Sequence, residues 1–246
     1  MSLPLAAAPV IPNFGGGSAK SYSCVIENHL FCPSWVTRNW SGVLWPALRQ
    51  HILLSVVAVA IGFAISLALA LAAYRYRRLE RPIAVFAGVL FTIPSLALFE
   101  LLTPISGLGL SVRTAEVALV SYTLLILFRN ITTGLRNVPA DVLEAAQGMG
   151  MTPRQSLWRV ELPLALPAII AGLRTATVTV IALATVAAVI CNEGLGAPIF
   201  AAIQENVFKT ELIAAGGLAV ALAIVADMLL VGLQRVLTPW SRARGG

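Results

Sequence analysis

The sequence predicts an all-α integral membrane protein of about five transmembrane helices, with its N-terminus outside and its C-terminus in the cytoplasm. Three observations predict this class: 58% of the 246 residues are hydrophobic and only 11% are charged, and the mean hydropathy is +0.86. A soluble domain carries about 25% charged residues, so this chain cannot cover a water-facing surface. This composition excludes an ordinary soluble enzyme and a disordered chain. The count of only 3 Cys excludes a disulfide-built mini-protein.

Five apolar segments account for the predicted spans. A bilayer core of about 30 Å requires about 20 mostly apolar residues in a helix. The second segment contains Pro94, which we expect to kink it, and Glu100; the fourth contains Arg174 and the fifth contains Asp227. The third segment is short unless it continues past Arg129. In chain order, the segments are 52–73, 83–102, 114–128, 167–191 and 212–233.

The basic residues set the direction of the spans. If the first span ends in the cytoplasm, eleven basic residues lie on that side: Arg75, Arg77, Arg78, Arg81, Arg129, Arg136, Arg154, Arg159, Arg235, Arg242 and Arg244. The opposite side then receives five: Lys20, Arg38, Arg49, Arg113 and Lys209. By the positive-inside rule the N-terminus is outside. The net charge of +6 is therefore attributed to basic residues that orient the spans in the membrane. No nucleic-acid partner is expected.

Residues 1–50 are expected to form an extracytoplasmic tail, mobile over 1–19, followed by an interfacial segment. Trp35, Trp40 and Trp45 precede the first span, and indole rings favour the headgroup layer. Packing of this segment against the outer loops of a partner is the alternative. The membrane domain is then 51–235, and 236–246 form a basic cytoplasmic tail.

Cys24 and Cys32 lie on the predicted oxidising side and are candidates for a disulfide. Metal binding by this pair with His29 is the alternative, but no fourth ligand is apparent. No metal site is therefore expected. The sequence also shows no catalytic constellation, because neither His29 nor the second histidine, His51, lies near a second likely metal ligand in a span.

The cytoplasmic loop 137–167 is expected to hold two short helices around a glycine turn. Pro139 suits the first turn of the first helix, and Asp141 lies near the positive end of its dipole. Gly148 and Gly150 are candidates to end this helix through a left-handed residue.

The second short helix of this loop is expected to run through Arg159. Thr152 is its candidate N-cap, and Pro153 suits its first position. Pro163 and Pro167 are then expected to redirect the chain into the fourth span.

The loop also carries a set of residues at fixed spacing: Glu144, Ala145, Ala146, Gly150, Val160, Leu162 and Pro163. This set resembles the EAA loop of permease subunits in bacterial ABC importers, with Val160 where that family usually has isoleucine. The resemblance covers about residues 50–235. Within it, TIPSLALF (92–99), VELPLALP (160–167) and AGLRTAT (171–177) resemble the osmoprotectant branch, which transports glycine betaine, carnitine, choline or proline-like compounds. Glu100 and the segment 191–196 depart from that branch.

The resemblance implies a type I importer permease fold and a place in the bacterial plasma (inner) membrane. It implies a cytoplasmic ABC ATPase dimer, a second identical or paralogous permease, and an extracytoplasmic solute-binding protein as partners, besides the lipid bilayer. The sequence has no G-x-x-x-x-G-K-[ST] phosphate loop. The chain is therefore expected to be a transport subunit without cofactors and not an enzyme, with ATP and magnesium bound by the partner ATPase.

Within the loop, Glu144 is expected to make charge-assisted contacts with the ATPase or to brace the loop. Ala145 and Ala146 permit close approach, and Gly150 supplies the turn. Arg154 and Trp158, spaced i,i+4 on one helix face, are candidate contacts with the ATPase. The alternative is that all these residues only shape a surface loop.

Two further sets of residues lie inside the predicted spans. Arg174 and Asp227 are candidates for an intramembrane ion pair that ties the last two spans, or Arg174 snorkels to the interface with Asp227 near a helix end. Pro94 and Glu100 are candidates for the solute pathway, or Glu100 is a solvated carboxylate at a helix end. The alternative functions are a permease for amino acids or another small solute and, more distantly, a secondary transporter.

Overall fold

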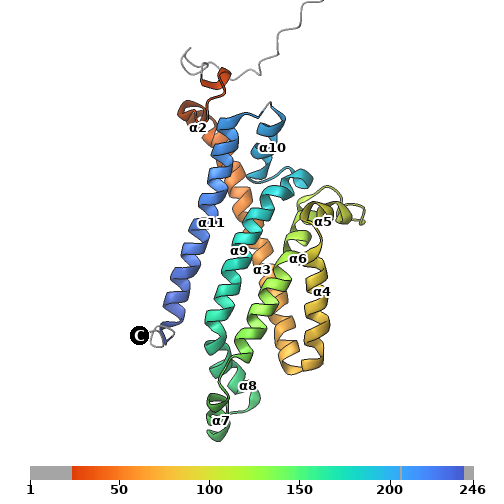
Figure 1. Ribbon diagram of the computed structural model, residues 1–246, viewed down its shortest axis with the longest axis vertical. Coiled ribbons are helices and arrows are strands. Elements are labelled where there is room, and N and C mark those ends of the chain that lie inside the picture. Colours follow the sequence, from red (N-terminus) through yellow and green to blue (C-terminus); the bar gives the residue numbers. More distant parts are fainter. Residues whose placement is uncertain (1–23, 206, 241–246) are drawn as a thin grey trace, which may run out of the picture.

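The computed structural model describes residues 24–205 and 207–240. The expected tail at 1–19 and most of the basic tail after 235 lie outside these residues. Figure 1 shows an elongated helical bundle in which α7 and α8 form one end, while α2 and α10 lie at the other. The described chain starts at the α2 end, and α11 runs from there toward the opposite end.

Among the described residues, four helical stretches are long and apolar enough to cross a membrane: Pro33–Arg75, Val112–Arg136, Pro153–Cys191 and Lys209–Leu237. They contain the long helices α3 (Trp45–Arg75), α6 (Val112–Arg136), α9 (Leu162–Cys191) and α11 (Lys209–Leu237). A bent pair of helical stretches, Arg77–Thr92 and Ser95–Leu102, is apolar and long enough to make a fifth when the two are taken as one span. The predicted class of about five transmembrane helices is therefore confirmed.

The second predicted span is not one continuous helix. A 3₁₀ turn (Arg77–Leu79) leads into α4 (Glu80–Thr92), and α5 (Ser95–Leu102) follows at a bend of 99°. Pro94 has no N–H to donate and pushes Ile93 into an extended conformation, with φ −68° and ψ 128°. The expected kink is thus a complete break.

The third and fourth spans are longer than the apolar runs predict. Helix α6 continues through Arg129 to Arg136, because the charged residues sit on its exposed side while apolar residues such as Ile131 remain buried. Helix α8 (Pro153–Ser156) does not end at Arg159 but passes through a π-helical turn (Leu157–Glu161) directly into α9.

Neither Pro163 nor Pro167 interrupts this continuous helix, so the expected redirection of the chain is wrong. Pro163 follows the π-helical turn Leu157–Glu161 directly, at the second residue of α9. Pro167 lies inside α9 and is accommodated there.

The core lies between α3, α6 and α9, where small residues bring the helices close together. Ala58 of α3, Ala118 of α6 and Ala184 of α9 are fully buried in one cluster with Leu119 and Phe99. Helix α11 packs chiefly against α9, and its buried side chains lie between Thr210 and Ala219. Its second half diverges from the bundle toward the end that carries α7 and α8 (Figure 1).

The tryptophan segment is helical and continuous with the first span. Helix α2 (Pro33–Asn39) passes through a π-helical turn (Trp40–Leu44) into α3. Trp35 is buried against Phe208, with ring centroids 5.3 Å apart, whereas Trp40 and Trp45 are exposed. Trp35 thus packs against the chain's own α10–α11 connection, where α10 spans Gly196–Gln204.

Candidate functional site

Helix α7 (Ala140–Gly148) ends in a left-handed glycine cap. Gly150 has φ +78°. The N–H of Met151 donates to the carbonyl of Ala146 (3.1 Å), and the N–H of Gly150 donates to that of Gln147 (2.9 Å). These two bonds form a Schellman motif, which satisfies the last carbonyls of the helix. Gly150, rather than Gly148, therefore supplies the turn between the two short helices.

Helix α8 begins with a capping box. The Thr152 hydroxyl accepts from the backbone N–H of Gln155, and the Gln155 side chain accepts from the N–H of Thr152 at 2.9 Å. Thr152 as N-cap and Pro153 in the first turn agree with the sequence pattern. In the following π-helical turn, the Ser156 hydroxyl donates to the buried Glu161 carboxylate at 2.8 Å. The whole segment is therefore a rigid helical body.

The predicted contact residues of this segment lie mostly on its surface. Glu144, Ala145 and Arg154 are exposed, and Trp158 is 57% exposed. Ala146 is buried and packs the segment inward. In the part of the chain that the structure describes, no hydrogen bond or ion pair engages the Glu144 side chain. The surface offers an indole, a guanidinium and a carboxylate to a partner, while the predicted bracing by Glu144 is not seen.

The end of the predicted motif connects this surface to the membrane domain. Val160, Leu162 and Pro163 are half-buried where the π-helical turn becomes α9. Leu162 packs against the cluster that contains Phe128 and Ile131 of α6. One continuous helix joins α8 to α9, so a displacement of α8 would move the start of α9.

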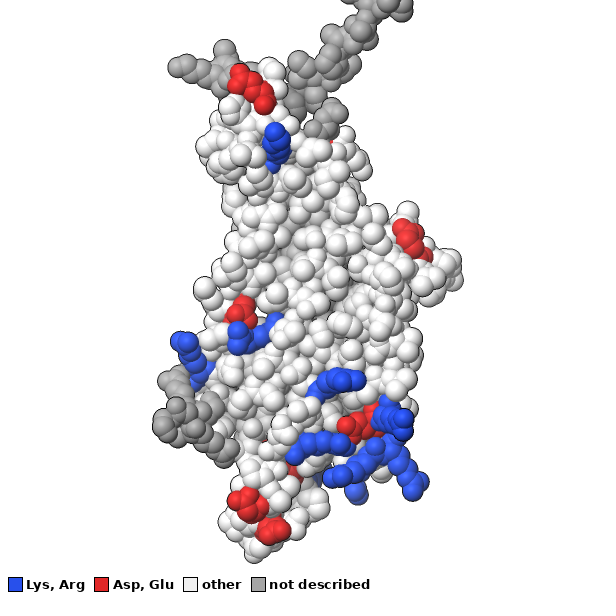
Figure 2. Space-filling view, viewed as in Figure 1, with Lys and Arg blue, Asp and Glu red and all other residues white. Residues whose placement is uncertain are grey.

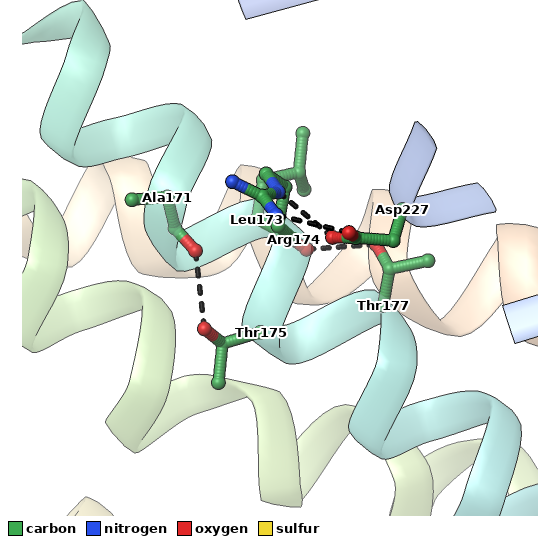
Figure 3. Close-up of polar contacts among 6 residues, drawn as sticks. All are labelled: Ala171, Leu173, Arg174, Thr175, Thr177 and Asp227. Atoms are coloured by element: carbon green, nitrogen blue, oxygen red, sulfur yellow. Dashed lines mark hydrogen bonds and ion pairs between the residues drawn. The ribbon is translucent and has the colours of Figure 1, made fainter. Parts of the chain in front are cut away.

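Arg174 and Asp227 lie together between α9 and α11, as Figure 3 shows. The Arg174 guanidinium donates from Nε to Oδ1 of Asp227 (2.7 Å) and from Nη2 to Oδ2 (2.9 Å). The two side chains are 34% and 35% exposed. They border a hollow of about 430 Å³, which is also lined by Thr175, Val178 and Thr179 of α9. Charged groups inside spans mostly face the bundle interior or a water-filled cavity.

Pro94 and Glu100 lie on other elements and are not brought together with this pair. Pro94 is the residue at the break between α4 and α5. Glu100 is exposed on α5, and its side chain has no hydrogen-bond or ion-pair partner among residues 24–205 and 207–240. Figure 1 places α5 toward the end of the bundle opposite α7 and α8.

Cys24 and Cys32 are joined in a disulfide, with their Cα atoms 6.1 Å apart. Cys32 is fully buried in a small cluster with Trp35 and Phe208. His29 does not join the cysteines; its Nε2 lies 2.7 Å from Oε2 of Glu27. Over the described ranges, no group of three or more potential ligands could hold a metal ion.

Two positioning residues were missed by the sequence reasoning. His51 is fully buried; its Nδ1 accepts from the N–H of Leu195 (3.2 Å), so its Nε2–H donates to the Ile181 carbonyl (3.0 Å). Glu161 holds the π-helical turn through Ser156. The available signal was weak: His51 follows Arg49 and Gln50 at the start of the first apolar run, and Glu161 directly precedes the apolar stretch of the fourth span. A polar residue that becomes buried at such a position requires a hydrogen-bond partner.

The described helices have the architecture of a multi-span membrane protein, with a capped helical segment at one end of the bundle. Residues 44–242 match the family described as binding-protein-dependent transport system inner membrane component. The chain belongs to this family. It is accordingly a multi-pass protein of the plasma membrane and the permease subunit of an ABC importer, in which a separate chain hydrolyses ATP.

Several permeases are similar over most of this chain. The osmoprotectant import permease protein OsmW of Salmonella typhimurium is 40% identical over 203 residues, covering 81% of this chain and 94% of that one. The choline transport system permease protein OpuBB of Bacillus subtilis is 39% identical over 191 residues (77% and 86%). The glycine betaine/carnitine/choline transport system permease protein OpuCB of Bacillus subtilis is 36% identical, with the same coverage.

Solved structures of ABC transporters share the fold. An inward-facing structure of the MetNI methionine ABC transporter has a TM-score of 0.71 at 21% identity, covering 80% of this chain and 96% of that one. An amino acid ABC transporter crystallised with histidines has a TM-score of 0.69 at 17% identity, covering 82% and 97%. These similarities establish the fold.

Proposed function

We propose that this permease imports osmoprotectants such as glycine betaine, carnitine, choline or proline-like solutes. The observation that carries the proposal is that the relatives at 36% to 40% identity are named for osmoprotectant, choline, glycine betaine or carnitine transport. The similar amino acid transporters are only 17% to 21% identical, so they favour the amino acid alternative much less.

The partner ATPase dimer docks on α7 and α8 and binds ATP and magnesium. Support comes from the exposed side chains of Glu144, Arg154 and Trp158 on a segment whose backbone is rigidly capped. Trp and Arg side chains are frequent anchors of protein interfaces, where a partner covers them. The continuous helix from α8 into α9 would carry the motion of the ATPase into the membrane.

The orientation proposed from the basic residues places α7 and α8 in the cytoplasm. The disulfide and the α2–α10 end then face the extracytoplasmic side, where a solute-binding protein delivers its cargo. A second permease, identical or paralogous, completes the pathway. The proposed domain division is an extracytoplasmic segment at 1–50, the membrane domain at 51–235 with the coupling loop at 137–167, and a basic cytoplasmic tail at 236–246.

The solute pathway includes the hollow beside Arg174 and Asp227. A charged pair that is about one-third exposed within a span is costly against lipid hydrocarbon but tolerable against water. The hydroxyl of Thr179, which bonds its own helix at the carbonyl of Thr175 (2.8 Å), adds polarity to the same wall. Pro94 and the exposed Glu100 would contribute nearer the extracytoplasmic end.

An uptake assay tests the proposal. The chain is reconstituted with its cognate ATPase and solute-binding protein, and the uptake of radiolabelled glycine betaine, choline, methionine and histidine is compared. We expect ATP-dependent uptake of glycine betaine or choline. Uptake of only the amino acids would support the alternative permease, and uptake driven by an ion gradient without the ATPase would indicate a secondary transporter.

A further inference from the structure

A basic hollow of about 580 Å³ lies between α4 and α6, beside the turn that follows α3. Four arginines from three elements surround it: Arg77 from the 3₁₀ turn, Arg81 from α4, and Arg129 and Arg136 from α6. Figure 2 shows basic side chains gathered over this part of the molecule, toward the end that carries α7 and α8. Orientation by the positive-inside rule requires basic residues on one side but not their convergence on one cavity.

The charge of this hollow is not compensated by the protein. Glu80 forms an ion pair with Arg136. In the described residues, Arg81 and Arg129 have no hydrogen-bond or ion-pair partner. Four arginines against the single Glu80 leave three formal positive charges around the cavity, which attract an anion.

The arginines are arranged in depth as well as around the opening. Arg129 precedes Arg136 by seven residues on α6, which corresponds to about 10 Å along the helix axis. The basic wall therefore extends from the helix end into the span. The side chains of Thr133 and Arg129 face the same hollow and offer hydrogen-bond donors at its wall.

An apolar surface adjoins the hollow on α4. Val85 and Val89 follow Arg81 at i+4 and i+8, on the same side of the helix, and they are 58% and 56% exposed. Phe86 beside them is 64% exposed. A ligand of this site is thus expected to combine a small anionic head with an apolar body.

We propose that this hollow binds the phosphate-bearing headgroup of an anionic phospholipid, whose acyl chains lie along α4. Guanidinium groups match phosphate oxygens in charge and geometry, and basic pockets between transmembrane helices bind such headgroups. Free phosphate and a phospholipid headgroup would both offer this site a phosphate anion. The apolar face of α4 favours the lipid, because only a lipid also carries acyl chains. The site does not depend on which solute the permease carries.

The test compares two double variants that lose the same charge from the same region. Arg81→Gln/Arg129→Gln removes two arginines of the hollow, whereas Arg75→Gln/Arg78→Gln removes one from the end of α3 and one from the adjacent turn, neither of which lines it. Each purified protein, in neutral detergent, is titrated with dioleoyl phosphatidylglycerol, dioleoyl phosphatidylcholine or inorganic phosphate. Bound lipid is counted by native mass spectrometry, and thermal stability is measured in parallel.

We expect phosphatidylglycerol to bind the wild-type protein and the Arg75/Arg78 variant alike, and the Arg81/Arg129 variant about tenfold to thirtyfold more weakly. Phosphatidylcholine should bind none of them specifically. Equal binding of phosphatidylglycerol by both variants would overturn the proposal. Stabilisation by inorganic phosphate alone, without retained lipid, would overturn the lipid assignment. If the double variant does not fold, Arg81→Gln and Arg78→Gln give the same comparison with single substitutions.

Discussion

Arg174 on α9 holds Asp227 on α11 through two parallel hydrogen bonds of 2.7 and 2.9 Å. Asp227 lies eight residues beyond Ala219, the last buried side chain of α11. The ion pair therefore fastens the half of α11 that diverges from the bundle and has little apolar contact of its own. In Figure 3, the neighbouring hydroxyls of Thr175 and Thr177 bond to their own helix, so they do not compete for either charge.

A double-mutant cycle should reveal this coupling. Asp227→Asn and Arg174→Gln each leave one charged group without its partner, so each should lower the melting temperature of the purified protein. The double variant should be more stable than the sum of the two effects predicts, because neither charge then remains unpaired. Thr175→Ala, which removes only a hydroxyl bonded within α9, is the control. Strictly additive effects would show that the two groups are not coupled.

The sequence predicted the spans well but not the way they break or continue. Apolar runs located the long helices, because a span requires about 20 consecutive apolar residues and such a run is visible in the sequence itself. Pro94 breaks its helix by 99°, whereas Pro167 lies within a continuous one. The difference depends on which backbone carbonyls find other partners, and this is a property of packing that local sequence does not contain.

Within the candidate site, the caps were predictable and the contacts between helices were not. Thr152 and Gly150 act through neighbouring backbone groups, so their roles follow from short-range pattern. Arg174 could equally pair or snorkel on sequence grounds, because the rotation of α9 relative to α11 decides the outcome. His51 was considered only as a metal ligand, and its true partners lie 130 and 144 residues away in the sequence.

Gly150→Ala should weaken coupling between ATP hydrolysis and transport. A side chain at φ +78° costs about 1–2 kcal/mol, which lowers the population of the capped loop by a factor of about 5 to 30. Solute uptake per ATP hydrolysed by the reconstituted importer is the measurement. Gly148→Ala is the matched control, because no atom lies within 4 Å of its added methyl group and it has no positive φ. Equal losses in both variants would contradict a specific role of the Gly150 cap.

Gly62→Ala should separate α3 from α6. A methyl group there would lie 2.9 Å from Cβ of Thr123 and would overlap the Thr123 hydroxyl, so we expect a loss of about 1–3 kcal/mol in stability. Gly88→Ala places the same group in open space and should be neutral or stabilising by up to about 1 kcal/mol, because alanine favours the helix. Thermal unfolding in detergent distinguishes the two. A destabilised Gly88→Ala with an unaffected Gly62→Ala would refute the packing of these helices.

His51→Leu should loosen the connection between α9 and α10 while leaving the spans in place. The substitution removes the acceptor of the Leu195 N–H and a second donor to the Ile181 carbonyl. The Leu195 N–H is then unpaired, which costs about 1–3 kcal/mol for a buried group. Hydrogen exchange at the Leu195 amide should therefore become faster, since its bond to Nδ1 is lost. His29→Gln alters an exposed histidine bonded to Glu27 and should leave that amide unchanged. Slow exchange at Leu195 in the His51→Leu protein would mean that packing, rather than this hydrogen bond, closes the turn against α3.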